Sequence, residues 1–283
     1  MRRIVIAITA LLCLACAGVA SAASSSPGTS TNSGYSAGFT VSGGAAKNVG
    51  VTVKETLAAT PPTGFGEPYP MANILTKVYG LSAPYAKYFP KCSAAQINAA
   101  GTSNQTWNGV CPKGALVATG TVNSELIPSI TSNPTLSASN GDSCKVTLDV
   151  YNAGSGNLAY FFVITPSDTC AGLATGAALA YPGTVKFQGG YLVNNVPEET
   201  DISFDAGGSG LWAPLLGETL NWNGKVKVKG KTYPYIVSTG CKKNARPWTA
   251  QFTGTNFTGT AAAGAPVTQS LLPSVTVGAS AKC

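Results

Sequence analysis

The 283-residue chain contains no histidine. This absence excludes Ser-His-Asp and Cys-His nucleophile systems, zinc sites that use histidine, and the usual proton shuttle at neutral pH. The chain also lacks a P-loop, a G-x-G-x-x-G motif between a strand and a helix, and the G-x-S-x-G nucleophile elbow. The sequence therefore disfavours most enzyme classes and predicts no cofactor.

Charged residues are also scarce, at 10% of the chain, against about a quarter in an average protein. Serine, threonine, asparagine and glycine supply the polar surface instead, which is common among extracellular β-proteins. Long apolar runs are absent after the N-terminal region, so we expect no transmembrane segment in the mature chain.

The N-terminal region is typical of a secretory signal peptide covering residues 1–22. Arg2 and Arg3 give the positive start, Ile4 to Val19 is almost entirely apolar, and Ala20-Ser21-Ala22 is a small-x-small cleavage site. An uncleaved anchor and a lipoprotein attached through Cys16 are alternatives. We expect a protein that is secreted, extracellular or at the cell surface.

Six cysteines remain after cleavage, and an even number in an exported protein favours three disulfides. Fifteen pairings are open, of which pairing between sequence neighbours is our prediction. The predicted pairs are Cys92–Cys111, Cys144–Cys170 and Cys241–Cys283.

The dominant periodicity of the mature chain is two, which indicates half-buried β-strands. Val49, Val51 and Val53 alternate with polar residues, and the same pattern recurs around 146–150 and 226–228. One short helix is expected over 94–100, with Ser93 as its N-cap. About a dozen strands predict an all-β fold, an antiparallel β-sandwich or jelly-roll-like domain.

Residues 23–45 are rich in Ser, Thr and Gly and predict a flexible leader, with one short strand possible at 39–41 and ordered structure starting near Lys47. The remaining residues, 46–283, predict a single β-sandwich domain. Two β lobes, 46–175 and 176–283, are the alternative.

One block of the sequence resembles a group of secreted actinobacterial proteins. It runs from Phe89-Pro90-Lys91-Cys92-Ser93 through Cys111-Pro112-Lys113-Gly114 to the strand at 115–121, with further similarity at 209–215 and 240–243. The resemblance implies export and an all-β fold. It implies no activity and no functional residues.

Four of the eleven acidic residues fall within 198–205. On a strand, Glu199, Asp201 and Asp205 would share one face. A solvated strand face, a Ca²⁺ site and a glycosidase acid/base pair are the three interpretations, and the first is favoured.

Basic charge is concentrated at the C-terminal end, since residues 219–283 hold eight basic residues and no acid. We expect a lysine stripe along one strand to bind a polyanion or to protect a sheet edge; sequence-specific nucleic-acid binding is not expected. The candidate residues are Lys225, Lys227, Lys229, Lys231, Lys242, Lys243 and Arg246.

Trp107 lies in a polar run between Cys92 and Cys111, so it is a candidate for glycan contact. Taken together, the sequence predicts a non-enzymatic exported protein with a binding or structural role, directed at anionic wall polymers or glycans. A histidine-free, carboxylate-based enzyme that acts on glycans is the alternative.

Overall fold

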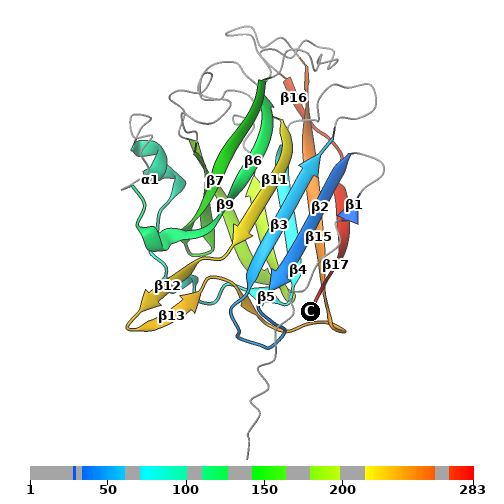
Figure 1. Ribbon diagram of the computed structural model, residues 1–283. Helices are drawn as coiled ribbons and strands as arrows, with labels where there is room; N and C mark the ends of the chain where they lie inside the picture. Colours follow the sequence, from blue (N-terminus) through cyan, green and yellow to red (C-terminus); the bar gives the residue numbers. More distant parts are fainter. Residues whose placement is uncertain are drawn as a thin grey trace, which may run out of the picture.

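The computed structural model describes residues 28–29, 34–60, 71–100, 110–126, 142–163, 179–197, 214–258 and 268–283. Within these residues the fold is almost entirely antiparallel β-structure (Figure 1). The strands are β1 (Gly28–Thr29), β2 (Tyr35–Ser42), β3 (Thr52–Ala59), β4 (Met71–Tyr79), β5 (Leu81–Ser82), β6 (Leu116–Leu126), β7 (Asp142–Gly154), β8 (Asn157–Val163), β9 (Leu179–Gln188), β10 (Tyr191–Pro197), β11 (Leu215–Trp222), β12 (Lys225–Val228), β13 (Lys231–Pro234), β14 (Val237–Ser238), β15 (Ala245–Thr258), β16 (Thr268–Leu271) and β17 (Val275–Lys282).

Thirteen strands form one sheet in the order β1-β2-β3-β11-β6-β7-β8-β9-β10-β4-β15-β16, with β17 also paired to β15. The sheet curls so that β17 lies beside β2 (Figure 1). Aromatic contacts cross the same seam: the rings of Tyr35 and Phe252 stack at 4.9 Å, and those of Phe39 and Trp248 lie 5.0 Å apart. The all-β prediction is confirmed. The other described strands form two small pairs, β12 with β13 and β5 with β14, so the described residues contain one large curled sheet rather than two large sheets.

The main core fills the inside of the curled sheet, because the inward position of each strand is apolar. On β3, for example, Val53, Leu57 and Ala59 are buried, whereas Lys54 between them is exposed. Strands from both halves of the chain contribute to this core, since β3 pairs with β11 and β4 pairs with β15.

A second, smaller core lies outside the sheet, beneath the helix α1 (Ala94–Ala99). The predicted Ser93 cap is confirmed: its hydroxyl accepts a hydrogen bond from the Gln96 N–H, and the Gln96 side chain accepts one from the Ser93 N–H. Such a capping box satisfies two amide groups at the start of the helix. Ile97 packs from α1 onto the outer faces of β7 and β8, where Tyr151 and Phe161 are buried.

Two of the three predicted disulfides are present, Cys92–Cys111 and Cys241–Cys283, with Cα atoms 5.4 and 6.3 Å apart. The predicted third pair includes Cys170, which lies outside the described residues. None of the helices in the part of the chain that the structure describes is long and apolar enough to cross a membrane.

The predicted flexible leader was partly wrong, because β2 occupies 35–42 within it. The segment was assigned to the leader on its Ser and Gly content, yet Tyr35, Ala37, Phe39 and Val41 alternate and are all buried. β2 pairs along its full length with β3. The predicted signal peptide at 1–22 lies outside the described residues.

Candidate functional site

A basic pole at one end of the sheet

The turns at one end of the sheet are linked to one another. The loop 43–51 joins β2 to β3, and its Asn48 N–H donates to the carbonyl of Ser238, 2.7 Å away. The Thr239 N–H donates to the carbonyl of Gly80, just after β4, at 2.7 Å. The Gly224 N–H, after β11, donates to the carbonyl of Val117 at 3.0 Å. Segments 43–51, 80–93, 110–115 and 223–244 therefore meet at a single end of the molecule.

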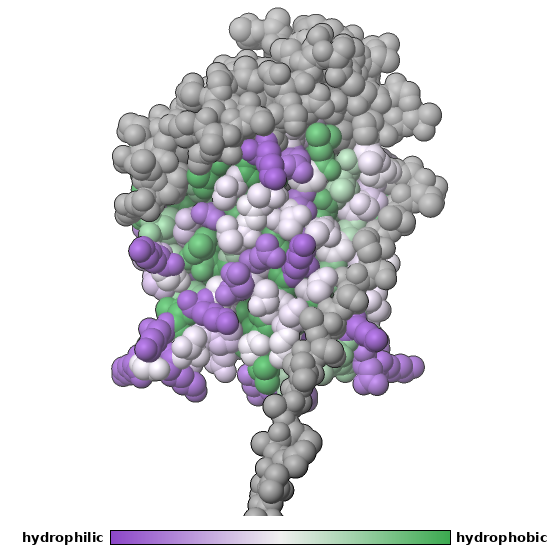
Figure 2. Space-filling model, in the orientation of Figure 1, coloured by the Kyte–Doolittle hydropathy of each residue, from purple (hydrophilic) through white to green (hydrophobic). Residues whose placement is uncertain are grey.

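These four segments carry ten lysines and neither Asp nor Glu. We call this surface the basic pole, and every one of its lysine side chains is exposed. Figure 2 shows hydrophilic residues at the lower left, over the β12–β13 hairpin, and at the lower right, near the start of β15. The ten are Lys47, Lys87, Lys91, Lys113, Lys225, Lys227, Lys229, Lys231, Lys242 and Lys243.

The four hairpin lysines do not alternate along one strand as predicted. β12 and β13 form a separate two-stranded hairpin, with Val228 opposite Lys231. Lys229 has a φ of 49° and Gly230 a φ of 80°, so these two residues form the turn. The sequence contains a signal for this turn, because Gly230 follows Lys229 and glycine is the usual residue where a turn needs positive φ. The charges consequently gather around a projecting hairpin.

Arg246 was wrongly grouped with these lysines. It lies at the start of β15 and is only 1% exposed. Its guanidinium donates to the carbonyls of Gly80 at 2.6 Å and Gly240 at 2.8 Å, and to the Ser238 hydroxyl at 2.8 Å. Burial lowers the pKa of this guanidinium. Arg246 holds the turns of the basic pole together from beneath and is not available to a ligand.

A buried carboxyl inside the sheet

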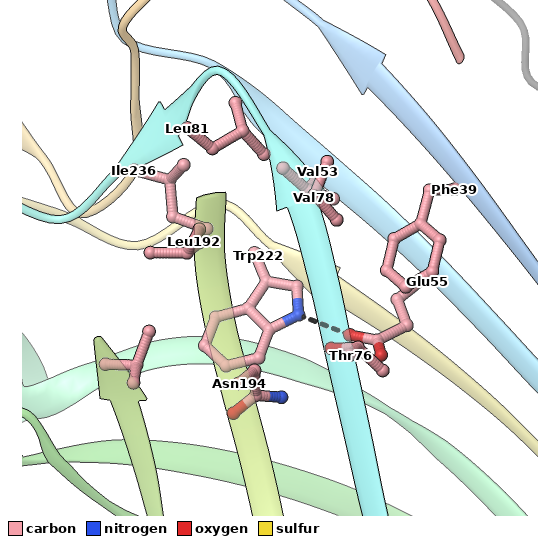
Figure 3. A pocket seen from close by; sticks show the side chains of 11 residues that line it. Phe39, Val53, Glu55, Thr76, Val78, Leu81, Leu192, Asn194, Trp222 and Ile236 are labelled. Atoms are coloured by element: carbon pink, nitrogen blue, oxygen red, sulfur yellow. Dashed lines mark hydrogen bonds between the residues drawn. The ribbon is translucent and has the colours of Figure 1, made fainter. Parts of the chain in front are cut away.

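Inside the curled sheet, the side chain of Glu55 interrupts a largely apolar inner face. Glu55 has the inward phase of β3 and is 3% exposed. The Trp222 indole N–H, from neighbouring β11, donates to its carboxyl at 3.0 Å. Thr76, from β4 across the interior, also donates to it. Figure 3 shows these three side chains converging.

The burial of Glu55 raises its pKa from 4.5 to about 7, although the hydrogen bonds from Trp222 and Thr76 oppose the rise. Burial favours the uncharged carboxyl because the low-dielectric interior solvates a charge poorly. At neutral pH this carboxyl therefore carries a proton about half of the time.

Three further polar side chains extend this cluster. The Tyr160 hydroxyl, on β8, donates to the amide oxygen of Asn194, on β10, at 2.8 Å, and both residues are buried. Burial, and next the charge of Glu55, raise the pKa of Tyr160. Glu218 has the same inward phase on β11, opposite Leu57, and it is half-buried.

A small cavity of about 20 Å³ lies beside Glu55, bordered by Phe39, Val185, Leu192 and Asn194 (Figure 3). A space of this size holds about one water molecule. It does not admit a sugar ring, so the geometry around Glu55 does not form a glycan cleft.

Glu199, Asp201 and Asp205 lie outside the described residues, as does Trp107, so the acidic and glycan-contact predictions stay predictions. Among the residues that the structure describes, no three Cys, Asp or Glu side chains gather as metal ligands would. Comparisons with protein-family models, curated proteins and solved structures found no match. The resemblance to secreted actinobacterial proteins likewise stays a prediction.

Sequence reasoning missed Glu55, although its signal is visible. The alternation of Val51 and Val53, both buried, continues directly to Glu55 and Leu57, which places the carboxyl on the buried face. A charged residue in phase with a run of inward valines marks a buried polar site.

Proposed function

We propose that this protein is an extracellular, non-enzymatic binding protein whose basic pole attaches to anionic polymers such as those of a cell wall. The observation that supports this most directly is the collection of ten exposed lysines on four chain segments that themselves contain no Asp or Glu. Surfaces of one sign attract flexible polyanions and raise their local concentration. The disulfides support an oxidising compartment.

The arrangement of the lysines supports a polymer ligand over a small one. They are spread over separate turns and around a projecting hairpin, and they border no described pocket. A long, flexible polyanion can contact many dispersed charges at once, and each contact contributes a small amount of binding free energy. The inner cavity at Glu55 offers no site of comparable access.

The test compares two variants with the same loss of four positive charges. The hairpin variant carries Lys225→Gln, Lys227→Gln, Lys229→Gln and Lys231→Gln. The matched control replaces four exposed lysines on the walls of the sheet, Lys54, Lys77, Lys145 and Lys186, by Gln.

On a teichoic-acid or heparin resin, we expect the hairpin variant to elute at clearly lower salt than wild type, and the control variant near wild type. Exposed charges are screened within about 8 Å at physiological ionic strength, so elution should follow the salt gradient steeply. Equal elution of the two variants would contradict the proposal, since net charge alone would then explain retention. If the hairpin variant elutes at the same salt concentration as wild type, the hairpin lysines do not bind the polymer. Their role is then to protect an open sheet edge.

A further inference from the structure

Three tyrosines meet at the surface of the basic pole. Tyr85 precedes the short 3-10 helix η1 (Ala86–Tyr88), Tyr88 is its last residue, and Tyr233 lies on β13 of the lysine hairpin. The ring centroid of Tyr233 is 4.5 Å from that of Tyr88 and 5.2 Å from that of Tyr85. Tyr88 is 37% exposed, so this cluster is not part of the core.

Two lysines are held against these rings. The Lys87 ammonium lies over the ring of Tyr88, 5.2 Å from its centroid, and the Lys231 ammonium lies over the ring of Tyr233 at 5.3 Å. Such cation–π contacts restrain flexible side chains that would otherwise move freely in solvent. Positive charge and aromatic surface are consequently presented next to each other.

The platform under the cluster is firmly anchored. The buried side-chain amide of Asn152 donates to the carbonyls of Phe89 at 3.2 Å and Pro90 at 3.1 Å. The ring of Phe89 packs edge-on against Tyr235, two residues after Tyr233, at 5.1 Å. The disulfide of Cys92 follows immediately in the chain. A binding surface that is fixed before its ligand arrives loses less conformational freedom on binding.

We propose that the cluster of Tyr85, Tyr88, Tyr233, Lys87 and Lys231 is a subsite for a polysaccharide whose sugars carry carboxylates. This inference rests on the proposed function and names the class of polymer. The C–H groups of a sugar ring pack against exposed tyrosine, its hydroxyls bond the phenol groups, and its carboxylate pairs with the adjacent ammonium groups.

A single-stranded nucleic acid fits the cluster less well. Bases bind aromatic side chains by stacking on an open ring face. Here the Lys87 and Lys231 ammonium groups lie over the rings of Tyr88 and Tyr233, and the three rings contact one another, so no ring stands alone as a flat platform for a base. A sugar acid needs less open ring area, because its hydroxyls and carboxylate also bond the phenol and ammonium groups.

The test uses Tyr88→Ala, with Tyr191→Ala as the matched control. Tyr191 belongs to another half-buried pair, with its ring 5.3 Å from that of Tyr79, and lies outside the tyrosine–lysine cluster. The probes are polygalacturonate, inorganic polyphosphate, oligo-dT and phosphatidylglycerol vesicles, each measured by binding at low salt.

We expect Tyr88→Ala to weaken polygalacturonate binding about five- to tenfold, the size of one lost aromatic contact, and to change polyphosphate binding less than twofold. Tyr191→Ala should change neither. An equal effect of Tyr88→Ala on both polymers, or no effect on either, overturns the sugar subsite and leaves the proposed function standing. A larger effect on oligo-dT or on vesicles than on polygalacturonate overturns it in favour of that ligand. If wild type binds neither polymer, the proposed function itself fails.

Discussion

The buried carboxyl of Glu55 makes the stability of the protein depend on pH. In the unfolded chain its pKa returns to about 4.5, whereas in the folded chain it is about 7. Between these values the folded state holds a proton that the unfolded state has released. The free energy of unfolding therefore falls as the pH rises through this range.

The size of the effect follows from the two pKa values. One pH unit of difference corresponds to about 1.4 kcal/mol, so the rise from 4.5 to about 7 corresponds to about 3 kcal/mol. This contribution is fully present below pH 4.5 and lost above the folded pKa. It is a large part of the 5–15 kcal/mol by which domains are typically stable.

Glu55→Gln removes the titration and keeps an oxygen that accepts the hydrogen bond of Trp222. Wild type loses this contribution as the pH rises, and the variant does not. We therefore expect the free energy of unfolding of the variant minus that of wild type to increase by about 3 kcal/mol from pH 4 to pH 8. Urea unfolding at a series of pH values measures the difference directly, and other titrating groups cancel in it.

The matched control is Asp149→Asn, which removes a negative charge from the outer face of β7. Asp149 accepts hydrogen bonds from the Thr119 hydroxyl at 2.7 Å and the Tyr151 hydroxyl at 3.3 Å. It controls for the loss of a hydrogen-bonded carboxylate outside the interior of the sheet. A Glu55→Gln difference that is constant from pH 4 to pH 8 would refute the reasoning.

The remaining predictions concern the anchoring of the fold. Arg246→Met should lower the free energy of unfolding by about 3 kcal/mol or more in urea melts, because several buried acceptors lose their donor at once. Retention of this variant on an anionic resin should stay unchanged. A loss of retention in the folded variant would show that the guanidinium reaches the ligand. Alkylation without reductant should label no cysteine in the mature chain, and peptide mapping should recover Cys144 linked to Cys170. A labelled Cys144 would contradict the third disulfide. An intact mass that differs from that of a chain starting at Ala23 would contradict the predicted cleavage site.

The fold class could be predicted because burial on one face of a strand leaves a period of two in the sequence. β3, β7 and β12 overlap the three stretches where this alternation predicts strands, 49–53, 146–150 and 226–228. The cap of α1 could be predicted because Ser93 and Gln96 have the spacing of a capping box.

The surface features needed information that alternation does not carry. Lys225 to Lys231 alternates as one strand would, and only the left-handed conformation at Lys229 and Gly230 separates two strands. The tyrosine cluster joins residues near position 88 to residue 233, a contact that depends on the fold. Arg246 is buried, unlike its exposed lysine neighbours, because its guanidinium bonds carbonyl groups on turns that are distant in sequence.

The strand order also determines which parts of the chain can find their partners early. β6 to β10 pair one after another along the chain, so each of these pairings joins strands that are neighbours in sequence. β3 must instead wait for β11, since the bonded residues Glu55 and Trp222 are 167 positions apart. Closing so long a loop has a high entropic cost, and sheets with such pairings fold slowly. During synthesis the β2–β3 hairpin is therefore made early, but β3 gains its second neighbouring strand only when nearly four-fifths of the chain exists.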